Sequence, residues 1–415
     1  MLRITAVGAG AVDYLLRGSG CEHAKERAQE APELDAEKGP DAARYFADAV
    51  EHGEPAGRWL GSGMEGLGLD ARPGDVAVDD DVRAVFGQLR RPESSEADPM
   101  WIGSKPRRYR DTAERLAELV AKEPGASEER LRELEVQAAG SGRRPVAYYD
   151  WTFSPAKSVS VYYASLLAAG LTEQAQAVRE AHDEAVRIAI AYAEKHAAYV
   201  RRGDHGINAE GARVGDFAQA TGLTVLTFSH STSREAEPQL HTHAAVLNRG
   251  GTDDGHIGAL DGRGFRPIKE AVATAYERAL EQLLNEELGL AFAERPDGLA
   301  REIVGVDPEL CSEASTRRGQ VTAKVDELMA AYRERHDTEP DAAARKAMAQ
   351  AATLSTRQPK SGLAGPAAVA AWAERRRDWC EDVLDQVDAA ALAAARAATA
   401  REVADTVAMT GPVAA

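Results

Sequence analysis

Two strand-like runs joined by a short connection constrain the fold of this chain more than any other feature. Residues 223–230 and 241–248 alternate apolar and polar side chains, as half-buried strands do. Only ten residues, including Pro238, separate the two runs, whereas a parallel crossover needs about a dozen or more. We therefore expect an antiparallel pair, which the alternating runs 2–7 and 145–153 extend into a sheet.

Long amphipathic segments supply helices to cover such a sheet. Residues 172–196 carry apolar side chains along one helical face, and residues 268–288 do the same before Gly289 ends the segment. Helices separate some of the expected strands, while other strands follow each other directly. This order predicts an α+β fold, with a central antiparallel β-sheet covered by helices.

The strand signal fades after residue 305, and the rest of the chain has helical character. Residues 306–350 are followed by a basic connector with Pro and Gly at 355–365, and the last fifty residues are rich in alanine. We expect one domain over residues 1–365 and a helical, Ala-rich C-terminal extension over residues 366–415.

The charge of the chain is strongly negative but unevenly distributed. Fifty Lys and Arg residues stand against 67 Asp and Glu residues, a formal net charge of −17. Residues 22–81 hold 16 acids and 6 bases, so this segment accounts for ten of those charges. We expect an acidic insertion at about residues 20–81 that forms a solvated, partly helical rim. The other 355 residues carry a net charge of only −7. The negative net charge of the whole chain therefore does not exclude a nucleic-acid partner.

Several protein classes are excluded by what the sequence lacks. The three cysteines are too scattered for a disulfide framework or a CxxC metal site. No apolar run approaches the ~18 residues of a membrane span, and the N-terminus has no signal-peptide pattern. No GxxxxGK[ST] phosphate loop is present, which argues against an ATP-driven motor. We expect a cytoplasmic protein without membrane insertion.

Three histidines that fall within fourteen residues are the sharpest chemical signal. His241 and His243 lie two apart on an expected strand, so both imidazoles point to one face, and Thr242 points to the other. His230 ends the preceding strand. In a hairpin the three rings converge and can hold a divalent metal with open positions, as phosphoryl or acyl chemistry requires. The alternative is a set of surface or hydrogen-bonded histidines.

A second motif, YDWTFSPAKSVS, covers residues 149–160. Asp150 lies in an otherwise apolar strand, where an acid is unusual. If Asp150 is functional, it is a partner for a metal-bound histidine or a proton acceptor. If it is structural, it is a hydrogen-bonded acid. Lys157 follows the strand and is a candidate phosphate contact.

These two motifs together resemble the TrwC/TraI-type conjugative relaxases of the HUH endonuclease superfamily. The likeness rests on FSPAKSVS at 153–160 and on HSTSREAEPQLHTH at 230–243, and it covers about residues 1–365. It implies an HUH relaxase palm without the helicase that commonly follows. The implied activity is that of a DNA relaxase, a tyrosine transesterase and single-strand endonuclease that serves conjugation and plasmid mobilisation.

The resemblance assigns the metal centre and its neighbouring acid. His230, His241 and His243 would hold a divalent ion, Mg²⁺ or Mn²⁺, with Zn²⁺ or Ni²⁺ as alternatives. Asp150 matches the acid that accepts the tyrosine proton or orients a metal-bound histidine. The expected substrate is single-stranded DNA at a transfer origin, and the expected partner is the coupling protein of the conjugation machinery.

The resemblance also places two catalytic tyrosines near the N-terminus. Tyr14 matches the nucleophile that forms a 5′-phosphotyrosine intermediate, and Tyr45 matches a second tyrosine that serves later strand transfer. This family branch often carries its tyrosines as adjacent pairs. Here Leu15 follows Tyr14 and Phe46 follows Tyr45, so each cluster keeps one phenol.

Basic residues in the two motifs and in two separate basic stretches are candidate DNA contacts. They are Lys157, Arg234, Lys105, Arg107, Arg108, Arg357 and Lys360.

Three other functions remain open on the sequence. A rolling-circle replication initiator of the same superfamily shares the metal and tyrosine chemistry. An HxH metal hydrolase would act on a small molecule without a covalent DNA step. An inactive DNA-binding accessory protein would use neither. The REAEPQLHTH context at 234–243 favours the transfer enzyme.

Overall fold

The structure is a computed structural model and describes most of the chain. The described residues are 1–8, 54–106, 110, 112–140, 145–207, 213–233, 235–298, 300–356 and 365–409. Seven predicted site residues lie outside them: Tyr14, Tyr45, Arg107, Arg108, Arg234, Arg357 and Lys360.

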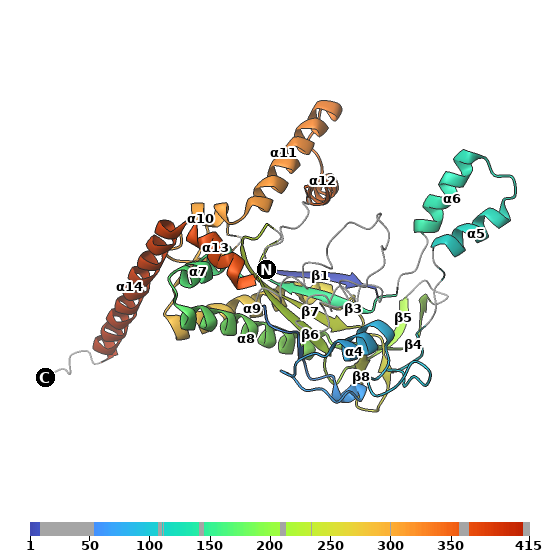
Figure 1. The fold of residues 1–415 in the computed structure, drawn as a ribbon, viewed down its shortest axis with the longest axis horizontal. Helices are drawn as coiled ribbons and strands as arrows, with labels where there is room; N and C mark the ends of the chain where they lie inside the picture. The colour runs from blue at the N-terminus through green and yellow to red at the C-terminus, as the bar shows by residue number, and fades with distance from the viewer. Residues whose placement is uncertain are drawn as a thin grey trace.

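A five-stranded antiparallel sheet forms the centre of the fold (Figure 1). Its strand order is β1 (Leu2–Val7), β3 (Tyr148–Phe153), β7 (Pro238–Leu247), β6 (Val225–Thr232) and β2 (Arg58–Leu60). Every neighbouring pair in it is antiparallel. The predicted α+β fold with a central antiparallel sheet is thereby confirmed, and so is the antiparallel pairing of β6 with β7.

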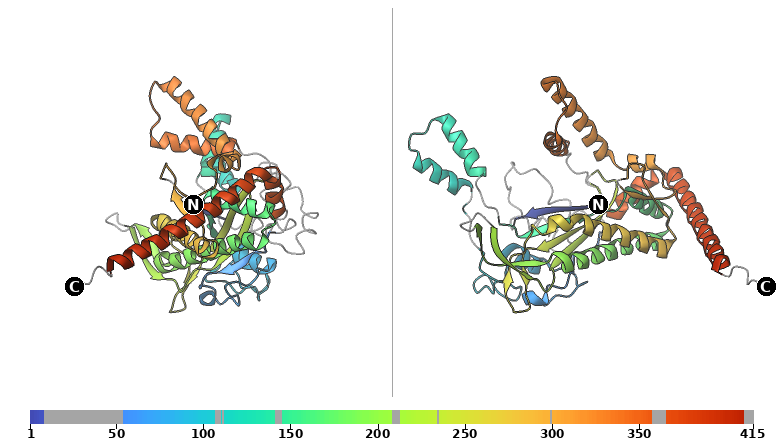
Figure 2. Two further views of the ribbon diagram at one scale, coloured as in Figure 1. Left: turned by 90° about the vertical axis from the view of Figure 1, so that its left-hand side faces the viewer. Right: turned by 180° about the vertical axis from the view of Figure 1, so that it is seen from behind.

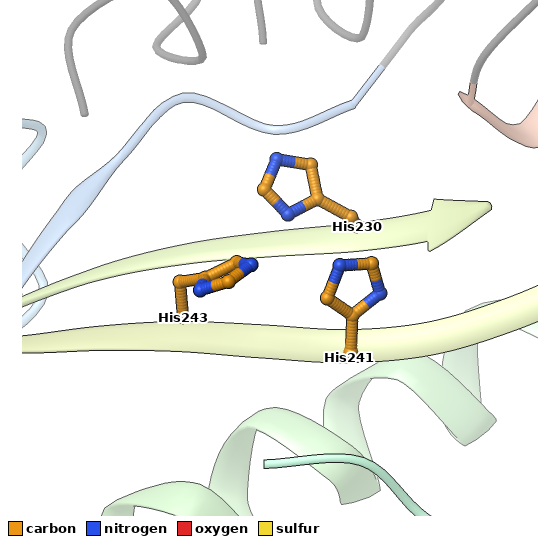
Figure 3. A group of neighbouring side chains, drawn as sticks. All are labelled: His230, His241 and His243. Carbon is orange, nitrogen blue, oxygen red and sulfur yellow. The ribbon is translucent and has the colours of Figure 1, made fainter. Parts of the chain in front are cut away.

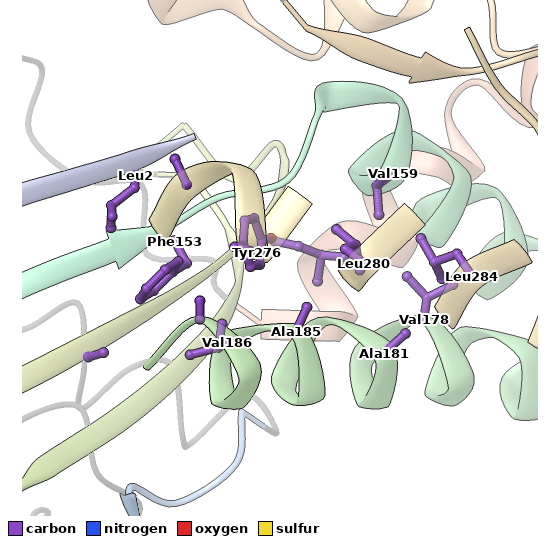
Figure 4. Packing of buried hydrophobic residues seen from close by; sticks show 14 of the residues in the cluster. Leu2, Phe153, Val159, Val178, Ala181, Ala185, Val186, Tyr276, Leu280 and Leu284 are labelled. Atoms are coloured by element: carbon purple, nitrogen blue, oxygen red, sulfur yellow. The ribbon is translucent and has the colours of Figure 1, made fainter. Parts of the chain in front are cut away.

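Two long helices, α8 (Thr172–Ala197) and α9 (Phe265–Leu288), cover one face of this sheet (Figure 1). Figure 4 shows side chains from both helices meeting those of the strands in the main hydrophobic core. The predicted helices 172–196 and 268–288 correspond closely to these elements. The core also takes in α7 (Lys157–Ala168), which follows β3.

A second, smaller core lies on the other face of the sheet, towards one end. Short elements build it: η2 (Glu65–Leu67), α4 (Asp79–Val82) and η3 (Arg83–Gln88). Their apolar side chains pack with strand residues in a cluster that includes Trp59, Met64, Leu67, Phe86, Tyr148, Leu226 and Phe228. The expected solvated rim is wrong where β2 joins the sheet and Trp59 is only 3% exposed, whereas residues 72–76 are exposed as expected.

The remaining strands form two-stranded units beside the main sheet. β4 (Tyr199–Ile207) pairs with β5 (Arg213–Gln219), and β8 (Gly250–Gly251) pairs with β9 (Ile257–Gly258). β10 (Phe292–Glu294) pairs with β11 (Arg301–Ile303).

Several helices stand out from the body of the molecule (Figures 1 and 2). α5 (Thr112–Lys122) and α6 (Glu128–Gly140) form one hairpin, and α11 (Thr316–His336) and α12 (Ala342–Ser355) form another, which follows α10 (Pro308–Glu313). No helix among the described residues is long and apolar enough to cross a membrane.

The last described helices begin against the main core. α13 (Gly365–Glu374) buries Val369 and Trp372 there, and the first turns of α14 (Arg377–Met409) bury Val383. The boundary expected after residue 365 stays a prediction, although these side chains pack in the same core as α7 and α8.

Candidate metal centre

The two central strands bring the three predicted histidines together. His230 on β6 is the direct cross-strand partner of His241 on β7, and His243 pairs with Phe228. Since side chains alternate along a strand, all three imidazoles project from one face of the sheet. Figure 3 shows the rings of His230, His241 and His243 turned towards one another between β6 and β7.

The geometry of the three rings is that of a metal site. One ligand atom from each histidine lies within 4.8 Å of the others. The ring centroids are 5.1 Å apart for His230 and His241, 5.3 Å for His241 and His243, and 5.7 Å for His230 and His243. Three nitrogen donors of this kind leave coordination positions open for a substrate.

Hydrogen bonds place a hydrogen on Nδ1 of two of these rings. The Nδ1 atom of His241 lies 2.9 Å from the carbonyl oxygen of Gln239, which can only accept, so Nδ1 carries the hydrogen. The Nδ1 atom of His243 lies 2.9 and 3.0 Å from the two carboxylate oxygens of Asp150, and the same reasoning applies. In the neutral form of each ring the lone pair then lies on Nε2, the atom that binds a metal.

The electrostatics also favour neutral ligands. Burial, and next the neighbouring His243 ring, lower the pKa of His241 to about 3. His241 is therefore uncharged at neutral pH, and its lone pair is available. The three histidines fit a divalent metal ion, and they form a divalent-metal site.

The segment that leads into β2 is tied to β6 beside the metal site. Glu54 is 5% exposed, and its Oε1 accepts hydrogen bonds from the backbone N and the hydroxyl of Ser231, at 2.5 and 2.6 Å. Its Oε2 forms an ion pair with Arg179 of α8 at 3.1 Å. A Cβ atom at Gly57 would lie 2.5 Å from the ring of Phe228, so only glycine allows this close approach. The segment before β2 therefore lies next to His230, the residue that precedes Ser231.

A row of hydrogen-bonded polar side chains occupies the opposite face, beneath the metal site, and runs from buried Thr242, His182 and Tyr276 to half-buried Ser229 and exposed Asp183. Thr242 lies between the two ligands of β7, and its hydroxyl is 2.9 Å from His182 Nε2 and 2.9 Å from the hydroxyl of Ser229. Ser229 in turn donates to Asp183 Oδ1 at 2.7 Å. His182 Nδ1 lies 2.8 Å from the hydroxyl of Tyr276 on α9. The prediction that Thr242 points to the face opposite His241 and His243 is confirmed.

Lys157 takes part in the internal packing of the fold. Its Nζ donates to the carbonyl oxygens of Pro238 and Ala314, both at 2.9 Å, and to Gln239 Oε1 at 2.7 Å. Burial lowers the pKa of Lys157 to about 8, so the ammonium keeps its three donors at neutral pH and all three are used. This geometry argues against the expected phosphate contact.

An exposed arginine lies on the metal face of the edge strand. Arg3 of β1 pairs with Thr152, and Thr152 pairs with His243. Thr152 faces the metal site, because its Oγ1 lies 3.4 Å from His243 Nδ1. As its direct partner, Arg3 projects from the same face, with its backbone about 10 Å from that of His243 at ~4.8 Å per strand. Lys105 is also exposed, in the loop before α5.

The structure thus brings together four of the predicted site residues: His230, His241, His243 and Asp150. The sequence interpretation missed Arg3, His182 and Glu54. Strand alternation could have indicated Arg3, because it falls on the polar face of an expected strand. No local pattern indicates the other two, since His182 is 60 residues from Thr242 and Glu54 is 177 residues from Ser231.

Comparison with known proteins identifies a family and several relatives that this chain resembles. The family model described as TrwC relaxase matches residues 13–379. The multifunctional conjugation protein TraI of Escherichia coli K12 is 29% identical over 210 residues, which are 50% of this chain and 9% of that protein. This chain therefore matches about a tenth of the length of that relative.

Solved structures of the same kind share the fold. A metal-bound structure of the conjugative relaxase TrwC in complex with oriT DNA superposes with a TM-score of 0.55 at 22% identity, over 92% of this chain and 98% of that one. TrwC complexed with a 27-mer DNA that comprises the recognition hairpin and the cleavage site gives a TM-score of 0.54 at 21% identity, with the same coverage.

Proposed function

This chain belongs to the TrwC relaxase family, and from that premise we propose that it nicks single-stranded DNA at a transfer origin. The reaction would be metal-dependent and specific for site and strand, and it would reseal by strand transfer during conjugation. The observation that carries the proposal is the convergence of His230, His241 and His243 on one face of the sheet, with two tautomers fixed for metal binding.

The proposed nucleophile is Tyr14. Its phenol oxygen attacks the scissile phosphorus, a new phosphotyrosine bond to the 5′ end forms, and the bond to the 3′ oxygen breaks. The phenol loses a proton and the departing 3′ oxygen gains one, so the phosphodiester count is unchanged. The step is reversible and needs no ATP, which suits strand transfer. Tyr45 is proposed as the second tyrosine, for the later transfer.

The metal would be held by the three imidazoles, and when bound it supplies Lewis-acid polarisation of a phosphoryl oxygen. The chain's own residues prepare that site. Asp150 acts through His243, because both carboxylate oxygens are within 3.0 Å of Nδ1. We assign it this positioning role rather than that of the proton acceptor. Three nitrogen ligands favour Mn²⁺, Zn²⁺ or Ni²⁺ over Mg²⁺, which prefers oxygen ligands.

The proposed substrate, partner and location follow from the same assignment. The substrate is single-stranded DNA, supported by the solved TrwC structures in complex with oriT DNA and by Arg3 on the metal face. The proposed protein partner is the coupling protein of the conjugation machinery. A cytoplasmic location is supported by the lack of a membrane-spanning helix in the described part of the chain.

One gel experiment tests this function. The protein is incubated with Mn²⁺ and a labelled single strand from the transfer origin of its own genetic element, and the products are separated under denaturing conditions. We expect a cleaved strand and a slower band of covalent protein–DNA complex, both absent with EDTA. Cleavage without the covalent band would favour a hydrolase. No cleavage with any divalent metal would favour an accessory protein.

A further inference from the structure

The polar chain beneath the metal site has one consistent hydrogen-bond direction. The carboxylate of Asp183 accepts from Ser229, so the Ser229 oxygen is left to accept from the hydroxyl of Thr242. Thr242 then accepts from His182 Nε2–H. Burial lowers the pKa of His182 to about 3, so the ring is neutral and its Nδ1 accepts from Tyr276. Every donor is used once, and the chain ends on the carboxylate.

These hydrogen bonds link β6 to β7 next to the metal ligands. Ser229 and Thr242 are direct cross-strand partners, and the following pair is His230 with His241. The register of β6 against β7 shifts between His230 and Thr232. Only the His230–His241 pair separates the Ser229–Thr242 pair from this irregularity. Near such an irregularity the backbone ladder alone constrains the positions of the ligands least.

Thr242 has a position that affects two ligands at once. It lies between His241 and His243, so a rotation of the backbone at Thr242 turns both rings on the other face. Its hydroxyl connects β7 to α8 through His182 and, through the same ring, to Tyr276 of α9. Both helices belong to the main core, and His182 and Tyr276 are 3% and 0% exposed.

We infer that Thr242, held by His182 and Ser229, is a positioning residue that sets the geometry of the metal-binding histidines from the opposite face of the sheet. The inference uses the metal centre of the proposed function but not the DNA chemistry. Its test therefore measures metal binding by the protein alone, and a failure to nick DNA would leave the test intact.

The variant Thr242→Val removes the hydroxyl and keeps the shape of the side chain. We expect Co²⁺ or Mn²⁺ to bind about tenfold more weakly, in the range seen when outer partners of ligands are lost, and the visible spectrum of bound Co²⁺ to change. Thr242→Ser restores the hydroxyl, so affinity and spectrum should return close to those of the natural protein. A merely structural role would lower the melting temperature without altering the spectrum.

Thr224→Val is the matched control. Thr224 is 0% exposed, and its Oγ1 has no hydrogen-bond partner within the part of the chain that the structure describes. Removing this hydroxyl should leave metal affinity and the Co²⁺ spectrum unchanged.

Ser229→Ala keeps the inference testable if Thr242→Val does not fold. Ser229 is only half-buried, and its loss breaks the same link from the β6 side. We expect weaker Co²⁺ binding, and no loss in the double variant beyond that of Thr242→Val, because Ser229 acts on the ligands through Thr242. The inference is overturned if folded Thr242→Val or Ser229→Ala binds Co²⁺ with unchanged affinity and spectrum, or if Thr242→Ser is as impaired as Thr242→Val.

Discussion

Asp150 and His243 lie on adjacent strands and share a hydrogen bond in which both carboxylate oxygens are within 3.0 Å of the imidazole Nδ1. The carboxylate fixes the hydrogen on Nδ1 and orients the ring, so Nε2 points to His230 and His241. Such carboxylate–histidine pairs raise the basicity of the ligand. This pair links the two sequence motifs, which lie about 90 residues apart.

Loss of the Asp150 carboxylate should weaken metal binding. We expect Asp150→Ala to lower the affinity for Mn²⁺ by about 10- to 100-fold. Asp150→Asn keeps an oxygen that can accept from Nδ1, so its loss should be smaller. Calorimetric titration of the metal-free protein measures both. Equal affinity in all three proteins would show that Asp150 does not act on the ligand.

Loss of a ligand should separate metal binding from DNA binding. We expect His241→Ala to abolish detectable Mn²⁺ binding and DNA cleavage, because only two of the three imidazole ligands remain. Binding of single-stranded DNA should largely survive. His336→Ala is the matched control, since His336 is exposed at the end of α11. Fluorescence anisotropy with a labelled strand follows DNA binding. If His241→Ala loses metal and DNA binding to the same extent, the histidine has a structural role.

Arg3 should contribute one phosphate contact. We expect Arg3→Ala to weaken single-stranded DNA binding and to reduce the slope of log affinity against log salt by about 0.7, the value for one phosphate on a single strand. Arg396→Ala removes the same charge from an exposed position on α14 and should leave the slope unchanged. Anisotropy at several salt concentrations gives both slopes. Identical slopes for the two variants would show that Arg3 does not contact a DNA phosphate.

The buried histidines should make the metal-free protein sensitive to acid. The pKa of His182 and that of His241 are lowered to about 3, against ~6.5 for an unfolded histidine. Between these values the unfolded chain binds more protons. The free energy of unfolding should therefore fall as the pH drops below 6.5, by up to about 1.4 kcal/mol per pH unit for each group.

The variant His182→Gln isolates one of these groups. It removes one titrating ring, so the pH slope of stability should decrease by about one proton. Urea unfolding in EDTA at pH 7, 6 and 5 measures the slope. If the slope does not change, His182 is not held neutral in the folded protein.

Much of the site could be predicted because it is built from strand periodicity. Alternation places His241 and His243 on one face and Thr242 on the other, and a ten-residue connection favours an antiparallel pair. These rules are local, and the structure follows them. The partnership of His243 with Asp150 could be suggested because an acid in an apolar strand needs a partner.

The rest depends on contacts between distant segments, which periodicity does not encode. Residues 54–81 looked solvated from their charge, but Trp59 closes the second core against Phe86 and β6. Lys157 looked like a phosphate ligand from its motif, yet its ammonium bonds to Ala314, 157 residues away. Charge alone does not indicate whether a side chain meets solvent, DNA or a buried carbonyl.

The most direct measurement locates the covalent bond. The protein is reacted with its transfer-origin strand and Mn²⁺, the adduct is digested, and the modified peptide is identified by mass spectrometry. We predict a nucleotide phosphate on Tyr14, and loss of the adduct in Tyr14→Phe but not in Tyr45→Phe for the first cleavage. An adduct on Tyr45 alone, or cleavage that leaves no phosphotyrosine on the protein, would contradict the account.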